Sequence, residues 1–279
     1  MKPLISILMA AYKAQSTILA AIESIFVQSY QHWELIIASD CGADYLALCE
    51  ENGIIDKRLT MITTSRPRSG PSIARNAALD KARGQLITIL DSDDTWLPGK
   101  LSVLQKLTEY SGLACDNTRA VKQDGTVIGL AHDGKSLQET IGSLDMMNCG
   151  VPHFPMFKKE LVGSGYRTDL NFAEDVVFNI ELITRAGGMA MSPQILTNYI
   201  QYPASATNSP QSWRRADLAY KKILAMLQAS ELSVPANDAE AIAASFVAKR
   251  KLNREYGQMV AKYGPMSFQA FLATQKLDN

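Results

Sequence analysis

Three carboxylates within four residues, Asp91, Asp93 and Asp94, follow directly after the apolar run 86–90. Like charges this close raise one another's pKa unless a cation or hydrogen-bond donors compensate them. Carboxylate oxygens suit Mg²⁺ or Mn²⁺, which usually complete their coordination shells with water and substrate phosphates. The segment therefore predicts a divalent-metal site that holds a phosphorylated substrate. The alternative is a solvated turn in which Asp94 or Thr95 caps the next helix.

A basic segment precedes the acidic one and could supply the positive charge that a diphosphate requires. Arg66 and Arg68 lie in a loop with Gly and Pro, and Arg75 lies in the helix that follows. The amino end of that helix would add free backbone N–H groups. Arg75 sits among small apolar residues, where an unpaired charge is costly, so we expect it to have an acidic partner. For Arg66 and Arg68, a solvated surface loop is nearly as good an interpretation.

Four more polar residues are candidates, although each has a plain structural interpretation. Glu174 and Asp175 begin a helical pattern, where acids stabilise the helix dipole, and local sequence alone favours that role. His153 lies between Pro152 and Phe154. A lone histidine is more often a hydrogen-bonded structural residue than a catalyst. Asp40 ends an apolar run and could be any turn residue.

The elements that must hold these residues read as a mixed α/β domain built largely on parallel strands. Strands are predicted at 4–9, 33–38, 59–63, 86–90 and 195–202, with a hairpin over 116–129. Helices are predicted from Ser16, from Ser72 to Gly84, over 100–110, near 136–147, from Glu174 to Gly187, and over 213–229 and 237–263. Asp91 then lies just past the carboxyl end of a strand, where open α/β sheets bind ligands.

Composition limits the classes of function. The 279 residues carry 28 basic and 28 acidic side chains, so broad electrostatic binding to nucleic acid is not expected. With 47% hydrophobic residues the chain can bury a sizeable core. The four cysteines lack CxxC spacing, so neither a zinc site nor a disulfide framework is predicted. The apolar stretch 4–11 is interpreted as a buried strand rather than a signal peptide, and we predict a cytoplasmic protein.

Taken in order, the motifs resemble those of the inverting family-2 glycosyltransferases of the GT-A fold, over about residues 3–205. Ile5-Ser6-Ile7-Leu8-Met9-Ala10-Ala11-Tyr12 is similar to that family's opening strand and nucleotide-contacting turn. Gly70-Pro71-Ser72-Ile73-Ala74-Arg75-Asn76 resembles its turn into a helix, and Asp91-Ser92-Asp93 its DxD motif. Glu174-Asp175 resembles its acidic pair, while Ser39 and Tyr202 replace an acid and a histidine that are frequent there.

The resemblance implies an α/β fold of the GT-A type with a mixed, mainly parallel central sheet. Residues 1–210 are then the catalytic domain, with a nucleotide-sugar-binding half over about 1–115 and an acceptor-binding half over about 116–210. Residues 211–279 form a C-terminal helical appendage, which we expect to pack on its own domain. Docking of its basic residues on a partner or a membrane surface is the alternative interpretation.

The resemblance also implies roles for the candidate residues. Asp175 is expected to be the general base, Asp91 and Asp93 to bind a divalent metal, and Glu174 and His153 to lie on the acceptor side. The residues expected to contact the nucleotide-sugar, including one from the basic loop, are Ala10, Tyr12, Asp40, Arg68, Arg75, Asp91, Ser92 and Asp93.

The function predicted from these residues is metal-dependent transfer of a sugar, hexosyltransferase-like, with inversion at the anomeric carbon. The donor is a nucleoside-diphosphate sugar, with UDP as the expected nucleotide, and the cofactor is Mn²⁺ or Mg²⁺. The acceptor is a glycan or a lipid-linked glycan of cell-envelope or exopolysaccharide synthesis, and no nucleic acid is expected as a partner. Location at the inner face of the membrane, peripheral membrane contact and assembly into a homo-oligomer are compatible with the sequence.

Two other classes stay open at this point. Asp91-Ser92-Asp93-Asp94-Thr95 also resembles the DxDxT motif of haloacid-dehalogenase-type phosphatases, in which Asp91 would be a nucleophile. That family normally opens its domain with the motif, whereas several predicted strands precede it here. A catalytically inactive homologue that still binds a sugar nucleotide is the other alternative, and the altered positions Ser39 and Tyr202 motivate it.

Overall fold

Fully buried strands form the centre of the computed structural model, which describes residues 2–132, 138–202, 211–264, 266, 268, 271 and 274. β1 (Ile5–Ala11), β2 (Trp33–Ser39) and β4 (Leu86–Ile89) are buried along almost their whole length. Such continuous apolar runs are typical of parallel strands covered on both faces. β1 pairs in parallel with both β2 and β4, and β2 pairs in parallel with β3 (Leu59–Thr63).

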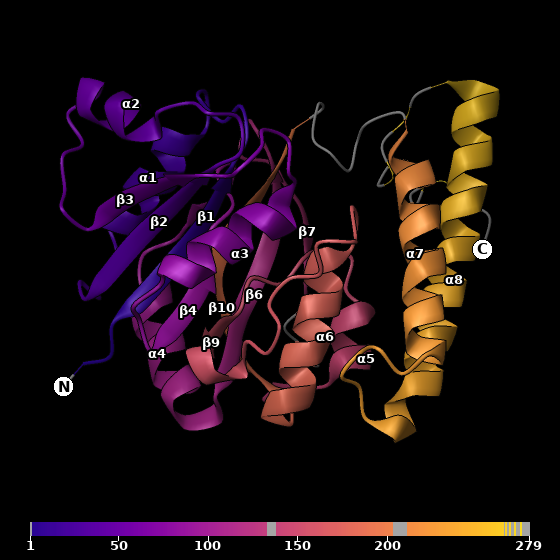
Figure 1. Cartoon of the computed structure of the whole chain (residues 1–279). Coiled ribbons are helices and arrows are strands. Elements are labelled where there is room, and N and C mark those ends of the chain that lie inside the picture. Colours follow the sequence, from indigo (N-terminus) through magenta and orange to yellow (C-terminus); the bar gives the residue numbers. More distant parts are fainter. Residues whose placement is uncertain are drawn as a thin grey trace.

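The sheet continues beyond β4 with mixed direction (Figure 1). β9 (Met156–Lys158) runs antiparallel to both β4 and β6 (Leu113–Lys122), and it thereby joins the two halves of the sheet. β10 (Met189–Gln201) pairs in parallel with β6 and antiparallel with β5 (Thr95–Trp96). β7 (Val127–Leu130) adds to β6 and β8 (Thr140–Ile141) to β10. The predicted mixed, mainly parallel central sheet is confirmed.

Two hydrophobic cores lie on opposite faces of the sheet, because alternate residues of each strand point to opposite sides. One core holds Ile7 and Met9 of β1 together with α1 (Ile18–Phe26), α2 (Tyr45–Glu51) and α4 (Lys100–Ser111). The other holds Leu8 with helices α3, α5, α6, α7 and α8. These helices span Pro71–Lys81, Ser143–Met147, Glu174–Ala186, Ser212–Gln228 and Ala236–Tyr263, and a 3₁₀ turn covers Lys159–Leu161.

The two C-terminal helices, α7 and α8, lie side by side against this second core (Figure 1). Ile223 of α7 and Phe246 of α8 are fully buried in the same cluster as Phe178 of α6. The helices therefore pack on the sheet-bearing part of the chain, while the division at residue 210 stays a prediction. Among the described residues, no helix is both long and apolar enough to cross a bilayer.

Three local predictions differ from the structure. The helix expected near 136–147 is shorter: it is α5 alone, and β8 precedes it. Gly142 is the N-cap of α5, and its backbone N–H donates a hydrogen bond to the Asp145 carboxylate. The first helix begins at Ile18 with Thr17 at its N-cap position, not Ser16. Neither Asp94 nor Thr95 caps a helix, because Thr95 begins β5 and Gly99 is the N-cap of α4. Residues 133–137, which include the start of the helix predicted near 136–147, lie outside the described residues. Residues 203–210, where the proposed domain boundary falls, lie outside them as well.

Candidate active site

Asp94 anchors the acidic turn after β4 to the far half of the sheet. Its backbone N–H donates to the Asp91 carbonyl at 3.1 Å, which closes the turn. Its Oδ1 accepts from the backbone N–H of Ile200 in β10 at 2.8 Å, and the side chain is buried. Burial and the neighbouring carboxylates raise its pKa well above the usual value. Asp94 therefore fixes the position of Asp91 and Asp93, and the helix-cap alternative is wrong.

Arg75 connects the acidic turn to the start of α6. This side chain of α3 is only 7% exposed, and its Nη2 lies 2.7 Å from Asp91 Oδ1. Its Nη1 lies 3.3 Å from Oε1 of Glu174, which is 99 positions away in the chain. The expectation that Arg75 has an acidic partner is confirmed, and it has two. Elements from both halves of the predicted catalytic domain thus meet at one guanidinium.

The acidic pair at the start of α6 is buried beside this guanidinium. Burial raises the pKa of Glu174 and that of Asp175, the charge of Asp91 raises both further, and Arg75 opposes the shift. Asp175 Oδ1 accepts a hydrogen bond from the backbone N–H of Val176 at 2.8 Å. Both acids do lie in the first turn of α6. A solvated first-turn acid, however, gains from the helix dipole without such a raised pKa.

Asp93 is a partly buried carboxyl group next to a second carboxylate. Burial and the nearby charge of Asp91 raise its pKa to about 6, and Arg75 offsets this only in part. The Oδ2 atom of Asp94 is buried without a hydrogen-bond partner among the described residues. Tyr202, at the end of β10, is close enough for both Asp93 and Asp94 to raise its pKa. A divalent cation held by carboxylate oxygens fits this set of donors.

The predicted nucleotide contacts gather at the carboxyl ends of β1 and β2. Asp40 is buried, and its carboxylate accepts from Thr64 Oγ1 at 2.7 Å and from the N–H groups of Ser69 and Gly70, each at 2.9 Å. These bonds fix the loop that carries Arg68. Gly70 has a φ of 93°, which disfavours any side chain there.

Tyr12 and Ala10 are the other two predicted nucleotide contacts at these strand ends. Arg68 Nε donates to the hydroxyl of Tyr12 at 2.7 Å across the loop. Ala10 is half-buried in β1, opposite Ala38 of β2. β1 lies between β2 and β4, so this edge is continuous with Asp91, Ser92 and Asp93. Whether each of these residues contacts a nucleotide stays a prediction.

Among the described residues, His153 makes no hydrogen bond or ion pair with the acidic turn or with Glu174 and Asp175. Its ring contacts His132, with the two Nε2 atoms 2.9 Å apart, and its carbonyl accepts from Asn179 of α6 at 3.2 Å. Its acceptor-side role stays a prediction.

The sequence did not single out Tyr166, which completes the surroundings of Arg75. Its ring centroid lies 5.4 Å from the guanidinium carbon and stacks on Phe178 at 4.0 Å. Asn76 holds the segment, because its side chain bonds both the N–H and the carbonyl of Tyr166 at 2.8 Å. A single tyrosine in a loop carries no local signal. The Arg75-Asn76 dipeptide was the one available hint, since an amide in that helix needs a partner.

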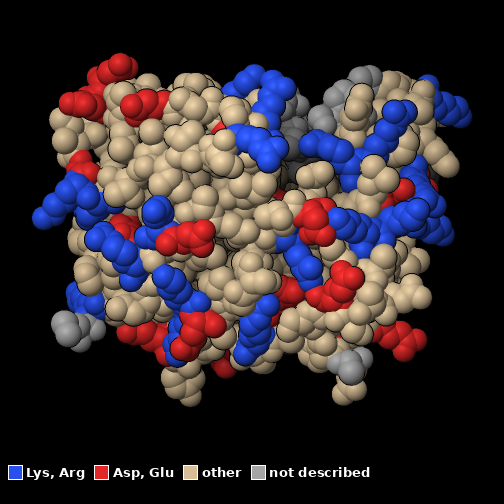
Figure 2. All heavy atoms as spheres, viewed as in Figure 1, with Lys and Arg blue, Asp and Glu red and all other residues tan. Residues whose placement is uncertain are grey.

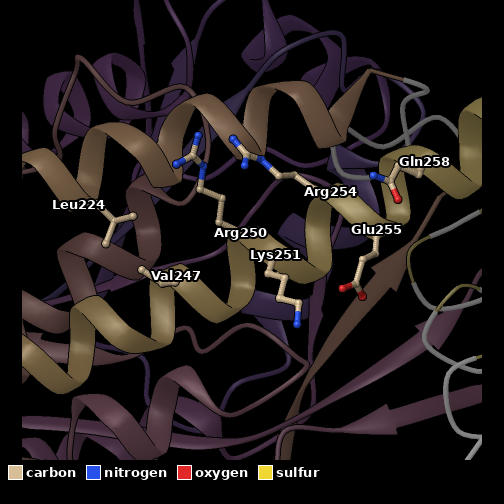
Figure 3. Close-up of a pocket in the computed structure, with 7 residues that line it drawn as sticks. All are labelled: Leu224, Val247, Arg250, Lys251, Arg254, Glu255 and Gln258. Carbon is tan, nitrogen blue, oxygen red and sulfur yellow. The ribbon is translucent and has the colours of Figure 1, made fainter.

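A groove between α7 and α8, of about 410 Å³, contains none of the predicted site residues (Figure 3). Leu224 and Val247 give it an apolar part, and five charged or polar side chains of α8 complete it. Arg250 and Arg254 both pair with Asp217 of α7, with each Nε atom 2.8 Å from the Asp217 Oδ1. Figure 2 shows basic side chains gathered over these two helices.

Comparison with known proteins agrees with this geometry. The family model described as "Glycosyl transferase family 2" matches residues 6–164, which is more than half of the chain. The matched segment includes β1, the loop of Arg68, α3 and the acidic turn.

Two curated relatives match part of the chain. TuaG of Bacillus subtilis (strain 168), assigned to teichuronic acid biosynthesis as a glycosyltransferase, is 33% identical in an alignment of 157 residues that covers 52% of this chain and 62% of TuaG. WfgD of Escherichia coli, a UDP-Glc:alpha-D-GlcNAc-diphosphoundecaprenol beta-1,3-glucosyltransferase, is 38% identical over 100 residues, which are 36% of this chain and 39% of WfgD. The matches thus span less than two thirds of either relative.

A solved structure shares the fold over nearly the whole chain. The crystal structure of Staphylococcus aureus TarS 1–349 in complex with UDP-GlcNAc superposes with a TM-score of 0.68 and 18% identity, covering 94% of this chain and 76% of the other. At this identity the likeness establishes the fold alone. The GT-A fold expected from the sequence motifs is confirmed.

Proposed function

The chain belongs to glycosyl transferase family 2, and from this membership we propose that it transfers a sugar from a nucleoside diphosphate to an acceptor hydroxyl. The observation that carries the proposal is the contact of Arg75 with both Asp91 and Glu174. It brings Asp91, a proposed ligand of the metal that would hold the donor's diphosphate, within electrostatic range of the buried pair Glu174 and Asp175. We assign that pair to the acceptor side. The phosphatase alternative is not favoured, since the family match begins well before the acidic turn.

Asp175 is the base in this proposal. Its carboxylate accepts the proton of the acceptor hydroxyl as that oxygen attacks the anomeric carbon. Burial and the charge of Asp91 raise its pKa, which strengthens it as a base, and Arg75 opposes that shift. One base suffices for direct displacement, so the anomeric configuration inverts.

Asp91 and Asp93 would hold the divalent ion, Mn²⁺ or Mg²⁺. When bound, the ion supplies Lewis-acid neutralisation of the charge that the departing nucleoside diphosphate acquires. The support for this ion is the presence of three carboxylates in one turn. Burial and the charge of Asp91 raise the pKa of one of them, Asp93, to about 6. Arg75 and the backbone N–H groups at the amino end of α3 add positive potential on the donor's side.

Binding of Mn²⁺ with UDP is expected to weaken as the pH falls through about 6, the raised pKa of Asp93. A protonated carboxyl cannot ligate, so each unit below that pKa costs roughly tenfold in affinity, while above it the affinity levels off. Titration calorimetry between pH 5 and pH 8 would measure this. Asp93→Asn should abolish the metal-dependent part of binding, and Asp80→Asn, an exposed acid of α3, should not. Metal binding that is unchanged in Asp93→Asn would remove this residue from the metal site.

The donor and acceptor follow from the chemistry named for the relatives. A UDP sugar is the proposed donor, and a diphosphate-linked lipid glycan of envelope or polysaccharide synthesis the proposed acceptor. The chain would then act at the inner face of the membrane, where such acceptors present their sugars. The basic side chains over α7 and α8 could contact anionic headgroups there.

A transfer assay tests the proposal as a whole. We expect the purified chain to move sugar from one of a panel of UDP, GDP and dTDP sugars to a lipid-linked glycan. The new linkage should have the opposite anomeric configuration to the donor, read from the proton coupling constant of the product by NMR. Retention of configuration would overturn the mechanism. Donor binding without transfer to any acceptor would favour the inactive homologue.

A further inference from the structure

Three side chains with metal-ligating atoms converge in a cluster that includes none of the residues of the acidic turn. His132 follows β7, Cys149 follows α5, and His153 precedes β9. Cys149 and His153 lie 17 and 21 positions after His132, so His132 is not part of a short motif with them. One ligand atom from each lies within 4.8 Å of the others, and His153 is buried.

Two of the separations between these atoms approach those of a tetrahedral site. Zinc bonds of about 2.0–2.1 Å to nitrogen and about 2.3 Å to sulfur place two ligand nitrogens about 3.3 Å apart and a sulfur about 3.6 Å from a nitrogen. Here the two Nε2 atoms are 2.9 Å apart, and Cys149 Sγ lies 3.7 Å from His132 Nε2. Small side-chain adjustments would bring all three onto one ion.

The surroundings hold two of the ligands in place. The backbone N–H of His132 donates to Asn117 Oδ1 at 3.0 Å, and Asn117 Nδ2 donates back to its carbonyl at 2.9 Å. His153 is fixed through its carbonyl by Asn179. The hydrogen bonds of Asn117 and Asn179 therefore fix the backbone that carries the two rings.

We infer that His132, Cys149 and His153 form a site for Zn²⁺ or a similar borderline-soft ion, distinct from the carboxylates that bind Mn²⁺ or Mg²⁺. One thiolate and two imidazoles select such an ion over a hard one. Burial raises the pKa of the Cys149 thiol to about 11, so binding must release its proton to the solvent. Three protein ligands leave a fourth position for water or another donor.

An ion here would tie together parts of the acceptor-side half. It would link the end of the β6–β7 hairpin to the segment between α5 and β9, which also contacts α6 through Asn179. α6 carries Glu174 and Asp175 at its start. The ion would therefore have a structural role, because it would hold in place the segment that contacts α6.

Cobalt substitution tests the site directly. The full chain, stripped of metal by a chelator, is titrated with Co²⁺ in excess Mg²⁺, which occupies the carboxylate site without competing for the thiolate. We expect one equivalent of Co²⁺ to produce a thiolate-to-cobalt charge-transfer band and intense visible bands of a tetrahedral ion. Binding of that Co²⁺ should release one proton, from the Cys149 thiol, and Zn²⁺ should then displace the Co²⁺ and bleach both sets of bands with no further proton release.

Variants identify the ligands. Cys149→Ser should lose the charge-transfer band, and His132→Asn should lose the tetrahedral visible bands, while His32→Asn, at the chain's exposed third histidine, should keep both. Zn²⁺ should raise the melting temperature of the wild type and of His32→Asn only. No charge-transfer band in the wild-type chain, or a band that survives Cys149→Ser, would overturn the inference. The wild-type result does not depend on whether any variant folds.

Discussion

Replacing Asp175 by Asn is expected to lower the rate of sugar transfer by roughly 10²–10⁴-fold, the usual contribution of a positioned general base. The amide keeps the size of the side chain, but it cannot accept the proton of the acceptor hydroxyl. Binding of UDP with Mn²⁺ should stay close to that of the wild type, because Asp91, Asp93 and Arg75 are untouched. Initial rates and titration calorimetry measure the two effects separately.

The control for Asp175→Asn is Asp169→Asn, which changes an exposed acid that pairs with Lys222. This variant should transfer sugar at the wild-type rate. Near-normal transfer by Asp175→Asn would mean that another group is the base, and Glu174, buried beside the same guanidinium, is then the next candidate. Loss of UDP binding in Asp175→Asn would instead point to a structural role for the carboxylate.

The first half of the fold could be predicted because its signals are local. Each strand from β1 to β4 is a short apolar run, and each is separated from the next by a helical pattern or a turn. Asp91 and Asp93 were identified for the same reason, since their charges lie within one turn. A central strand of three residues, β9, was missed because Met156–Lys158 is too short to show any period.

The contacts across the sheet could not be predicted, since they depend on residues distant in the chain. The sequence required a partner for Arg75 but did not indicate that Glu174 would be one of the two. Asp94 resembled a helix cap because its partner, the N–H of Ile200, lies 106 positions away. The same limit hid the cluster of His132 and His153.

Lys100→Met is expected to lower the free energy of unfolding by about 3–5 kcal/mol, the usual cost of breaking a buried ion pair. Lys100 is fully buried, and its Nζ pairs with the fully buried carboxylate of Asp116. Asp116 also accepts from the N–H of Leu196 at 3.1 Å and from Thr197 Oγ1 at 2.8 Å, so the pair joins α4, β6 and β10. Methionine fills the space but leaves the carboxylate without its cation. Urea unfolding followed by circular dichroism gives the change.

Two variants separate the buried pair from a general effect of losing a lysine. Lys222→Met removes an exposed partner of Asp169, and it should cost less than about 1 kcal/mol because solvent screens that pair. The double variant Lys100→Met/Asp116→Asn should recover part of the stability lost by Lys100→Met, since a neutral amide is cheaper to bury than an unpaired carboxylate. If Lys100→Met cost no more than Lys222→Met, the buried pair would not be what holds α4 against the sheet.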